Sequence, residues 1–257
     1  MSTLLQVDDI SKRFGALQAI ESLKFTVNEG EILGIIGPNG AGKTTAINLI
    51  SGMMRPDRGS VTFAGEDVTA LRTDVLVRRG MVRTFQATTV YQDRTVRENV
   101  LRGAYARMYP GFVHSLWNDG KARRMRQAAE EAVDELLTRL SLAEVAGVSA
   151  RNLPYGHQKV LGLAIALAAR PRLMMLDEPA AGLSHDEAVQ LGEVIRRTNR
   201  AGVSVIVVDH NMRFMSNLCQ RIVVLHHGAE LAMGTPQEIT RDPRVIDAYL
   251  GSLHEPA

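Results

Sequence analysis

Eight residues near the start of the chain, Gly37 to Thr44, constrain its fold more than any other feature. They carry the spacing Gly-x-x-x-x-Gly-Lys-Thr. A short apolar run over 31–36 precedes them, and apolar residues at helical spacing follow over 45–51. Glycines let a backbone approach a ligand closely, and a strand–loop–helix junction points N–H groups and the positive helix end at an anion. The motif therefore predicts a phosphate-binding loop in an α/β fold.

The side chains of this loop suit a nucleotide bound together with Mg²⁺. Lys43 would supply a point charge between the β- and γ-phosphates, and the Thr44 hydroxyl would ligate the metal ion. Backbone N–H groups would cradle the β-phosphate. The predicted nucleotide-binding residues are Gly37, Pro38, Asn39, Gly40, Ala41, Gly42, Lys43, Thr44 and Thr45.

Two adjacent carboxylates form a second candidate element. Asp177 and Glu178 follow the apolar run 173–176, which reads as a buried strand. In open α/β sheets, ligands collect at the carboxyl ends of the strands, so both side chains would face the phosphate loop. Asp177 would hold Mg²⁺, and Glu178 would polarise an attacking water as general base.

Alternating strand and helix patterns predict one α/β domain over residues 1–257, with a mainly parallel sheet and helices on both faces. Helical periodicity without strand signal predicts an inserted helical subdomain over 97–170, with a loop at 109–118. The core would then comprise 1–96 and 171–257, including added antiparallel strands. The expected strands are 4–8, 22–27, 31–36, 58–63, 173–176, 203–208, 222–225 and 230–233, the last two turning at Gly228, and a helix over 243–250 closes the chain.

Composition excludes some classes of protein. The net charge of +2 and the pI of about 8.8 are too mild for a dedicated nucleic-acid binder. No window approaches the roughly 20 apolar residues of a membrane span, and no secretory signal opens the chain. The single cysteine, Cys219, is expected to be a small buried hydrophobe. We therefore expect a cytoplasmic protein, and any membrane span in its complex would belong to another chain.

Five further segments occur in a recognisable order around the two motifs. They are Phe14, Thr84-Phe85-Gln86, Leu153 to Gln158, Ala181 to Ser184, and Val208-Asp209-His210. Together with the phosphate loop and the carboxylates, they resemble the ATP-binding cassette (ABC) ATPases over essentially the whole chain. The resemblance implies a RecA-like P-loop NTPase core with an antiparallel β subdomain and an inserted α-helical subdomain.

The resemblance also implies roles for these residues in ATP binding and hydrolysis. Phe14 would stack on adenine, and Gln86 and His210 would join Glu178 as catalytic residues. Gln86 would also contact Mg²⁺, alongside Thr44 and Asp177. A signature segment would close over ATP held by a second cassette, and its residues are Leu153, Pro154, Tyr155, Gly156, His157 and Gln158.

Two positions depart from the family pattern. Pro154 stands where the signature usually has serine, and Ser184 replaces the usual aspartate. Proline fits the first turn of a helix, so the helix could still begin there, but the hydroxyl and one N–H are lost. We expect a weakened site on the partner's nucleotide, while Lys43 and Glu178 of this chain stay intact.

Finer features are similar to the larger ATPase subunit of branched-chain amino-acid importers. These are Pro179 to Leu183, the Tyr155-Gly156 form of the signature, the long loop after 97–100 and the ending 242–251. That resemblance implies two transmembrane permease subunits, a second and different ATPase subunit with a homodimer as the alternative, and a periplasmic or external solute-binding protein. The chain would then lie on the inner face of the cell membrane.

Other functions remain open. Urea or amide, aromatic-acid and lipid or lipopolysaccharide systems use similar ATPases, and the solute is chosen by other subunits. A mechanochemical ATPase acting on nucleic acid or ribosomes is disfavoured, because the chain has one cassette, no sustained heptads and no basic stripe. A regulator without turnover is disfavoured by the presence of Lys43, Glu178 and His210 together.

Overall fold

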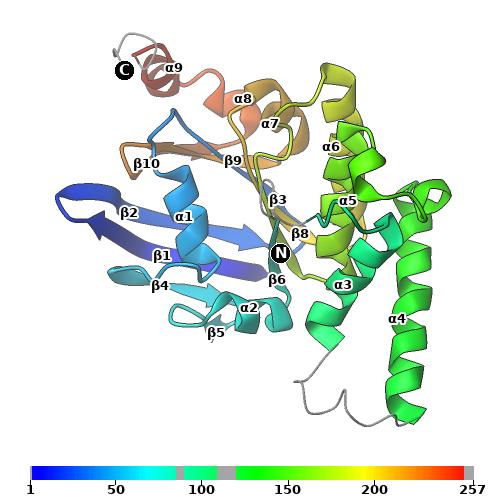
Figure 1. Ribbon diagram of the computed structural model, residues 1–257. Coiled ribbons are helices and arrows are strands. Elements are labelled where there is room, and N and C mark those ends of the chain that lie inside the picture. The colour runs from blue at the N-terminus through cyan, green and yellow to red at the C-terminus, as the bar shows by residue number, and fades with distance from the viewer. Residues whose placement is uncertain (1, 85–89, 109–119, 252–257) are drawn as a thin grey trace.

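The computed structural model describes residues 2–84, 90–108 and 120–251 (Figure 1). Within these residues, ten strands form a continuous sheet in the order β5-β4-β1-β2-β10-β9-β3-β8-β7-β6. The strands are β1 (Thr3–Phe14), β2 (Leu17–Asn28), β3 (Ile32–Ile36), β4 (Arg58–Phe63), β5 (Glu66–Asp67), β6 (Met81–Thr84), β7 (Leu173–Asp177), β8 (Ser204–Val208), β9 (Arg221–His226) and β10 (Ala229–Gly234).

Five neighbouring strands, β9, β3, β8, β7 and β6, run parallel to one another. They are short apolar runs with little internal alternation, as in the wholly buried β3 and β8. Such runs are typical of parallel strands that are covered on both faces. The predicted parallel core is therefore confirmed.

Alternate residues of these strands face two separate hydrophobic clusters. Leu33 and Ile35 of β3 pack with helix α1 (Lys43–Ile50) and with the antiparallel strands β1, β2 and β4. Ile32 and Ile36 pack on the other face with α5 (Tyr155–Ala168), α6 (His185–Arg200) and α7 (Met212–Leu218). The sheet is thus sandwiched between helices, and the phosphate loop leaves it at the end of a buried central strand.

The antiparallel part of the sheet is longer than the sequence pattern predicts. The expected strands 4–8 and 22–27 are parts of β1 and β2, which have 12 residues each. The pairing of β1 with β2 is interrupted between Val7 and Ile10, where Asp9 has a φ of 50°. This irregularity breaks the two-residue alternation that marks a strand, so the pattern alone ended the strand too early. The predicted antiparallel hairpin of β9 and β10 is confirmed.

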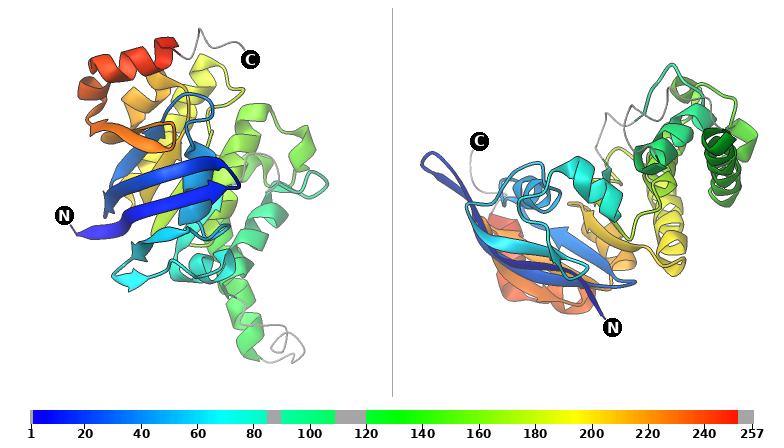
Figure 2. Two further views of the ribbon diagram at one scale, coloured as in Figure 1. Left: turned by 90° about the vertical axis from the view of Figure 1, so that its left-hand side faces the viewer. Right: turned by 90° about the horizontal axis from the view of Figure 1, so that it is seen from below.

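Helices dominate the described residues 96–108 and 120–168. Helices α3 (Val96–Met108), α4 (Gly120–Arg139) and α5 share a third hydrophobic cluster, which includes Val100, Val133 and Leu161. Figures 1 and 2 show α3 and α4 on the side of the molecule opposite the β1–β2 hairpin. The boundaries of a separate helical subdomain stay a prediction, and the loop expected at 109–118 lies outside the described residues.

Capping boxes mark the start of two helices. Helix α6 begins at a capping box, in which Ser184 and Glu187 satisfy each other's backbone N–H groups. Helix α8 (Pro236–Ile239) begins with the same device, built from Thr235 and Glu238. Helices α2 (Thr73–Arg79), α7 and α9 (Pro243–Gly251) complete the described helices, together with short 3₁₀ turns at Ala143–Val145 and Ala150–Asn152.

Candidate functional site

The phosphate loop occupies the turn between β3 and α1, and two of its glycines leave no room for a side chain. A Cβ at Gly37 would lie 2.2 Å from the carbonyl oxygen of Leu225. A Cβ at Gly42, which has a φ of 99°, would lie 2.7 Å from the carbonyl oxygen of Ala19. The loop is therefore pressed against the ends of β9 and β2, which holds its backbone in place. Thr44, predicted to ligate Mg²⁺, is exposed in the first turn of α1.

Lys43 is the first residue of α1 and is buried. Its Nζ donates to the carbonyl oxygens of Gly37 and Pro38, at 2.7 and 2.9 Å. Burial lowers the pKa of this ammonium, while Glu178, Asp177 and Asp209 act in the opposite direction. The predicted lysine therefore lies close to the predicted carboxylates, although 134 residues separate Lys43 from Asp177 (177 − 43).

Arg83 is a site residue that the sequence patterns did not indicate. It lies on β6 beside the end of β7, and its Nη2 donates to Oδ2 of Asp177 at 2.7 Å. Both side chains are almost completely buried, with 5% and 11% of their surface exposed. The same guanidinium also donates to Asn48 and Ser51 of the α1 segment. Arg83 thus ties the predicted metal ligand to the helix that follows the phosphate loop.

Glu178 and His210 lie side by side at the ends of β7 and β8. Nδ1 of His210 is 3.9 Å from Oε1 of Glu178. Glu178 has a φ of 46°, and its N–H donates to the carbonyl oxygen of Val208 at 2.7 Å. A positive φ is uncommon for glutamate and is typical of residues held in place by their surroundings at functional sites. The structure brings together Glu178 and His210, two of the three predicted catalytic residues.

Asp209, next to His210, was not predicted as a separate site residue. Its carboxylate is 1% exposed and accepts hydrogen bonds from the N–H groups of Ala180 and Asn211, at 3.1 and 2.9 Å. These bonds fix the turn after Glu178 to the turn after β8. Asp209 therefore holds in place the two turns that carry Glu178 and His210.

The signature segment is placed at the start of α5, with one correction. We expected Pro154 in the first helical turn, but it is the N-cap residue in an extended conformation, with a ψ of 148°, and the helix begins at Tyr155. The N–H of an N-cap residue takes part in no hydrogen bond within the helix, so proline, which has no N–H, suits this position. Leu153 is buried, Pro154, Tyr155 and His157 are exposed, and Gly156 and Gln158 are half-buried.

Phe14 and Gln86 are the two remaining candidate residues. Phe14 ends β1 and is 45% exposed, with Nζ of Lys12 6.0 Å from its ring centroid. An exposed ring at a strand end is not part of the core and is free to stack on a planar group. Gln86 lies outside the described residues, so its role stays a prediction.

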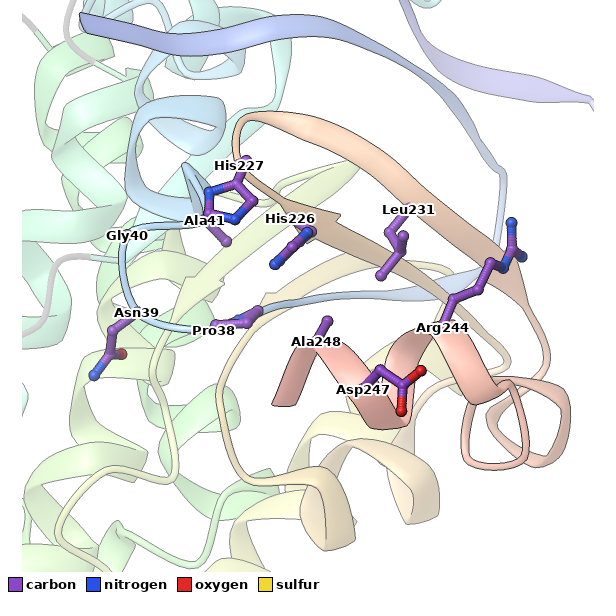
Figure 3. A pocket seen from close by; sticks show the side chains of 10 residues that line it. All are labelled: Pro38, Asn39, Gly40, Ala41, His226, His227, Leu231, Arg244, Asp247 and Ala248. Carbon is purple, nitrogen blue, oxygen red and sulfur yellow. The ribbon is translucent and has the colours of Figure 1, made fainter. Parts of the chain in front are cut away.

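A cavity of about 510 Å³ lies beside the phosphate loop (Figure 3). One wall is formed by the loop residues Pro38 to Ala41, and another by Arg244, Asp247 and Ala248 of α9. The next residue, Tyr249, faces the N–H of Gly37, and burial raises the pKa of its hydroxyl to about 12. The C-terminal helix thus packs against the loop. The remaining lining residues are His226, His227 and Leu231.

The lysine-bearing loop after β3 and the carboxylates at the end of β7 define a P-loop nucleoside triphosphatase. Comparison with known proteins specifies the class further. The family described as "ABC transporter" matches residues 20–181, and the family described as "Branched-chain amino acid ATP-binding cassette transporter" matches residues 230–255. The chain belongs to the ABC transporter ATP-binding family, whose cassettes bind and hydrolyse ATP.

Individual relatives agree with this assignment. The chain is 37% identical to the high-affinity branched-chain amino acid transport ATP-binding protein BraF of Pseudomonas aeruginosa, over 96% of this chain and 98% of BraF. It is 33% identical to the lipopolysaccharide export system ATP-binding protein LptB of Acidithiobacillus ferridurans, over 98% of both. The crystal structure of the ADP conformation of MJ1267, an ATP-binding cassette of an ABC transporter, superimposes with a TM-score of 0.86 and 28% identity, covering 98% of this chain and 100% of MJ1267. The predicted fold class is confirmed.

Within the described residues, no helix combines the length and the apolar character needed to cross a membrane. The longest described helix, α4, has 20 residues but is rich in charge.

Proposed function

We propose that this chain is the ATP-hydrolysing subunit of an importer for branched-chain or related amino acids. The match of residues 230–255 to a family of branched-chain amino-acid cassettes carries this proposal, because it covers the part of the chain that lies outside the general ABC match. The identity with BraF over nearly the full length of both proteins supports it. The partners would be two permease subunits, a second cassette and an external solute-binding protein.

The roles proposed for the site follow from its geometry. Lys43 would exchange its two carbonyl partners for phosphate oxygens, which are stronger acceptors. Thr44 and Asp177 supply the hydroxyl and carboxylate oxygens that Mg²⁺ prefers, so these residues fit the ion, which would neutralise phosphate charge. Glu178 would accept a proton from the attacking water, and His210 lies within reach of the same position.

The proposal includes a shared site. The signature segment begins a helix whose N-terminus would face ATP held by a second cassette, as the family resemblance implies. Pro154 offers no hydroxyl there, and α5 has no side-chain cap of its own. Pro154→Ser in the assembled complex is expected to raise ATP turnover. Unchanged turnover would show that the partner's site is not limited by this residue.

Lipopolysaccharide export is the second candidate, since LptB is 33% identical over 98% of each chain. The two candidates differ in the C-terminal match, which carries the branched-chain description. The two candidate functions also predict different phenotypes for a strain that lacks this chain. Loss of an importer ATPase removes solute uptake and leaves the cell envelope intact.

The test is complementation in a strain that lacks this chain. We expect the wild-type chain to restore uptake of radiolabelled leucine, isoleucine or valine, whereas Glu178→Gln should not. The purified Glu178→Gln chain should also form an ATP-dependent dimer, alone or with its partner cassette, because ATP that is not hydrolysed keeps the closed state bound. Glu193→Gln is the control, since Glu193 pairs with Arg196 on an outer face of α6. Restored uptake with Glu178→Gln would refute the role of Glu178, and an envelope defect with normal uptake would favour export.

A further inference from the structure

Helix α5, which carries the signature segment, has a carboxylate from another helix beside its N-terminus. Pro154 has no side chain that can accept a hydrogen bond, and the first N–H groups of a helix need acceptors. The carboxylate of Glu187 on α6 lies beside Gly156, in the first turn of α5. A Cβ on Gly156 would lie 2.9 Å from Oε1 of Glu187, so glycine permits this close approach. Glu187 therefore places a negative charge at the N-terminus of α5, where a serine or aspartate cap is usual.

The same carboxylate also caps its own helix. Oε2 of Glu187 accepts from the N–H and from the hydroxyl of Ser184, both at 2.9 Å. These bonds to Ser184 lower the pKa of Glu187, so it is ionised at neutral pH. One charged group thus joins the first turns of α5 and α6.

A second contact runs parallel to the first. The hydroxyl of Tyr155 donates to the carbonyl oxygen of Ala181 at 3.3 Å. A Cβ at Gly182 would lie 3.0 Å from Cε1 of Tyr155, so the ring rests on the glycine backbone. Ala181 is three residues beyond Glu178, in the turn that Asp209 also anchors. Tyr155 therefore connects the start of α5 to the turn that carries the proposed general base.

We propose that Tyr155 and Glu187, here called the α5–α6 strut, are positioning residues that couple the signature segment to Glu178 of the same chain. The strut rests on the proposed function, in which α5 faces the partner's nucleotide and Glu178 serves this chain's own. A shift of α5 on meeting the partner's phosphate would be passed through these two contacts to the turn at 179–184. The two ATP sites of a cassette pair would thereby be coupled.

The test compares ATP hydrolysis by the full chain with that of Tyr155→Phe, Glu187→Gln and the double variant. Phenylalanine keeps the ring and removes only the hydroxyl. Glutamine keeps one oxygen for Ser184 and removes the negative charge beside the first turn of α5. We expect kcat to fall about tenfold or more in each single variant, because small misplacement of a catalytic group costs up to roughly 100-fold. The KM for ATP should stay within about twofold, the Hill coefficient should approach 1, and the double variant should resemble the singles.

Glu238→Gln is the matched control, because Glu238 forms the same capping box with Thr235 on α8. It should lower thermal stability about as much as Glu187→Gln does while leaving kcat and the Hill coefficient unchanged. The strut is refuted if kcat in Tyr155→Phe and Glu187→Gln stays within about twofold of wild type, or if Glu238→Gln lowers it equally. Glu178→Gln distinguishes failure of the strut from failure of the proposed site. If that variant still hydrolyses ATP, the proposed site is wrong. If it is inactive while the strut variants are fully active, only the strut is refuted.

Discussion

Replacing Arg83 with methionine tests whether the buried ion pair organises the site. Methionine retains much of the length of the side chain and removes the guanidinium. In the wild type, this group contacts Asp177 at 2.7 Å and also reaches the α1 segment through Ser51 at 3.3 Å. The substitution therefore leaves the carboxylate of Asp177 in a place where only 11% of its side chain is exposed.

The size of the expected stability loss follows from the burial of the Arg83–Asp177 pair. Breaking a buried pair by removing one partner typically costs 3–5 kcal/mol, because the remaining charge has lost water and gains nothing in return. We expect Arg83→Met to lower the free energy of unfolding by about 3 kcal/mol. An exposed pair gives a scale for comparison: Arg172 contacts Glu29 at 2.8 Å, but both side chains are about half exposed, at 51% and 52%. Arg172→Met should therefore cost no more than about 1 kcal/mol.

Urea denaturation followed by circular dichroism measures both variants under the same conditions. A double variant, Arg83→Met with Asp177→Asn, removes the unpaired charge and should recover stability relative to Arg83→Met alone. A loss of less than about 1 kcal/mol in Arg83→Met would refute the reasoning. So would a double variant that loses the full sum of the two single losses, because the two residues would then act independently.

Two further predictions concern the core behind the phosphate loop. Gly34→Ala should destabilise the protein by about 1–3 kcal/mol, measured by urea denaturation, because a Cβ would lie 2.8 Å from Cε of Met215 and 2.9 Å from Sγ of Cys219; full stability would contradict this packing. Burial raises the pKa of Cys219 from 9.0 to about 12, so its thiol should resist iodoacetamide in the folded protein and react once urea is added. Since the unfolded thiol ionises first as pH rises, this residue stabilises the fold below pH 9 and loses that contribution between pH 9 and 12; rapid labelling of the folded chain would refute the burial.

The phosphate loop and the carboxylates could be predicted because the residues that carry their chemistry are consecutive in the sequence. Lys43 follows its glycines directly, and Asp177 and Glu178 follow a short apolar run that is indeed β7. The expected burial of Cys219 is confirmed as well. Local patterns suffice where one segment both forms the element and carries the function.

Arg83 and Glu187 could not be predicted in this way, because each acts through partners far along the chain. Arg83 looks like a surface residue at the end of a four-residue strand, and only the pairing of β6 with β7 places it on Asp177. Glu187 fits an ordinary capping box in sequence, yet its second acceptor position faces Gly156 of another helix. The topology of the sheet and the packing of α5 on α6 assign these roles.

The arrangement of charge indicates how Arg83 would affect nucleotide binding in the proposed site. Three carboxylates, Asp177, Glu178 and Asp209, act on Lys43, while Arg83 already balances Asp177. In the proposed site, a metal ion bound by Asp177 would meet a carboxylate that is already paired with a guanidinium, so its affinity would depend on how far that pair opens. An incoming triphosphate adds negative charge beside Lys43 and favours its ammonium form, which burial alone disfavours. In the proposed site, Arg83 would therefore influence the metal ligand Asp177, while the three carboxylates favour the ammonium form of Lys43 that would bind the phosphates.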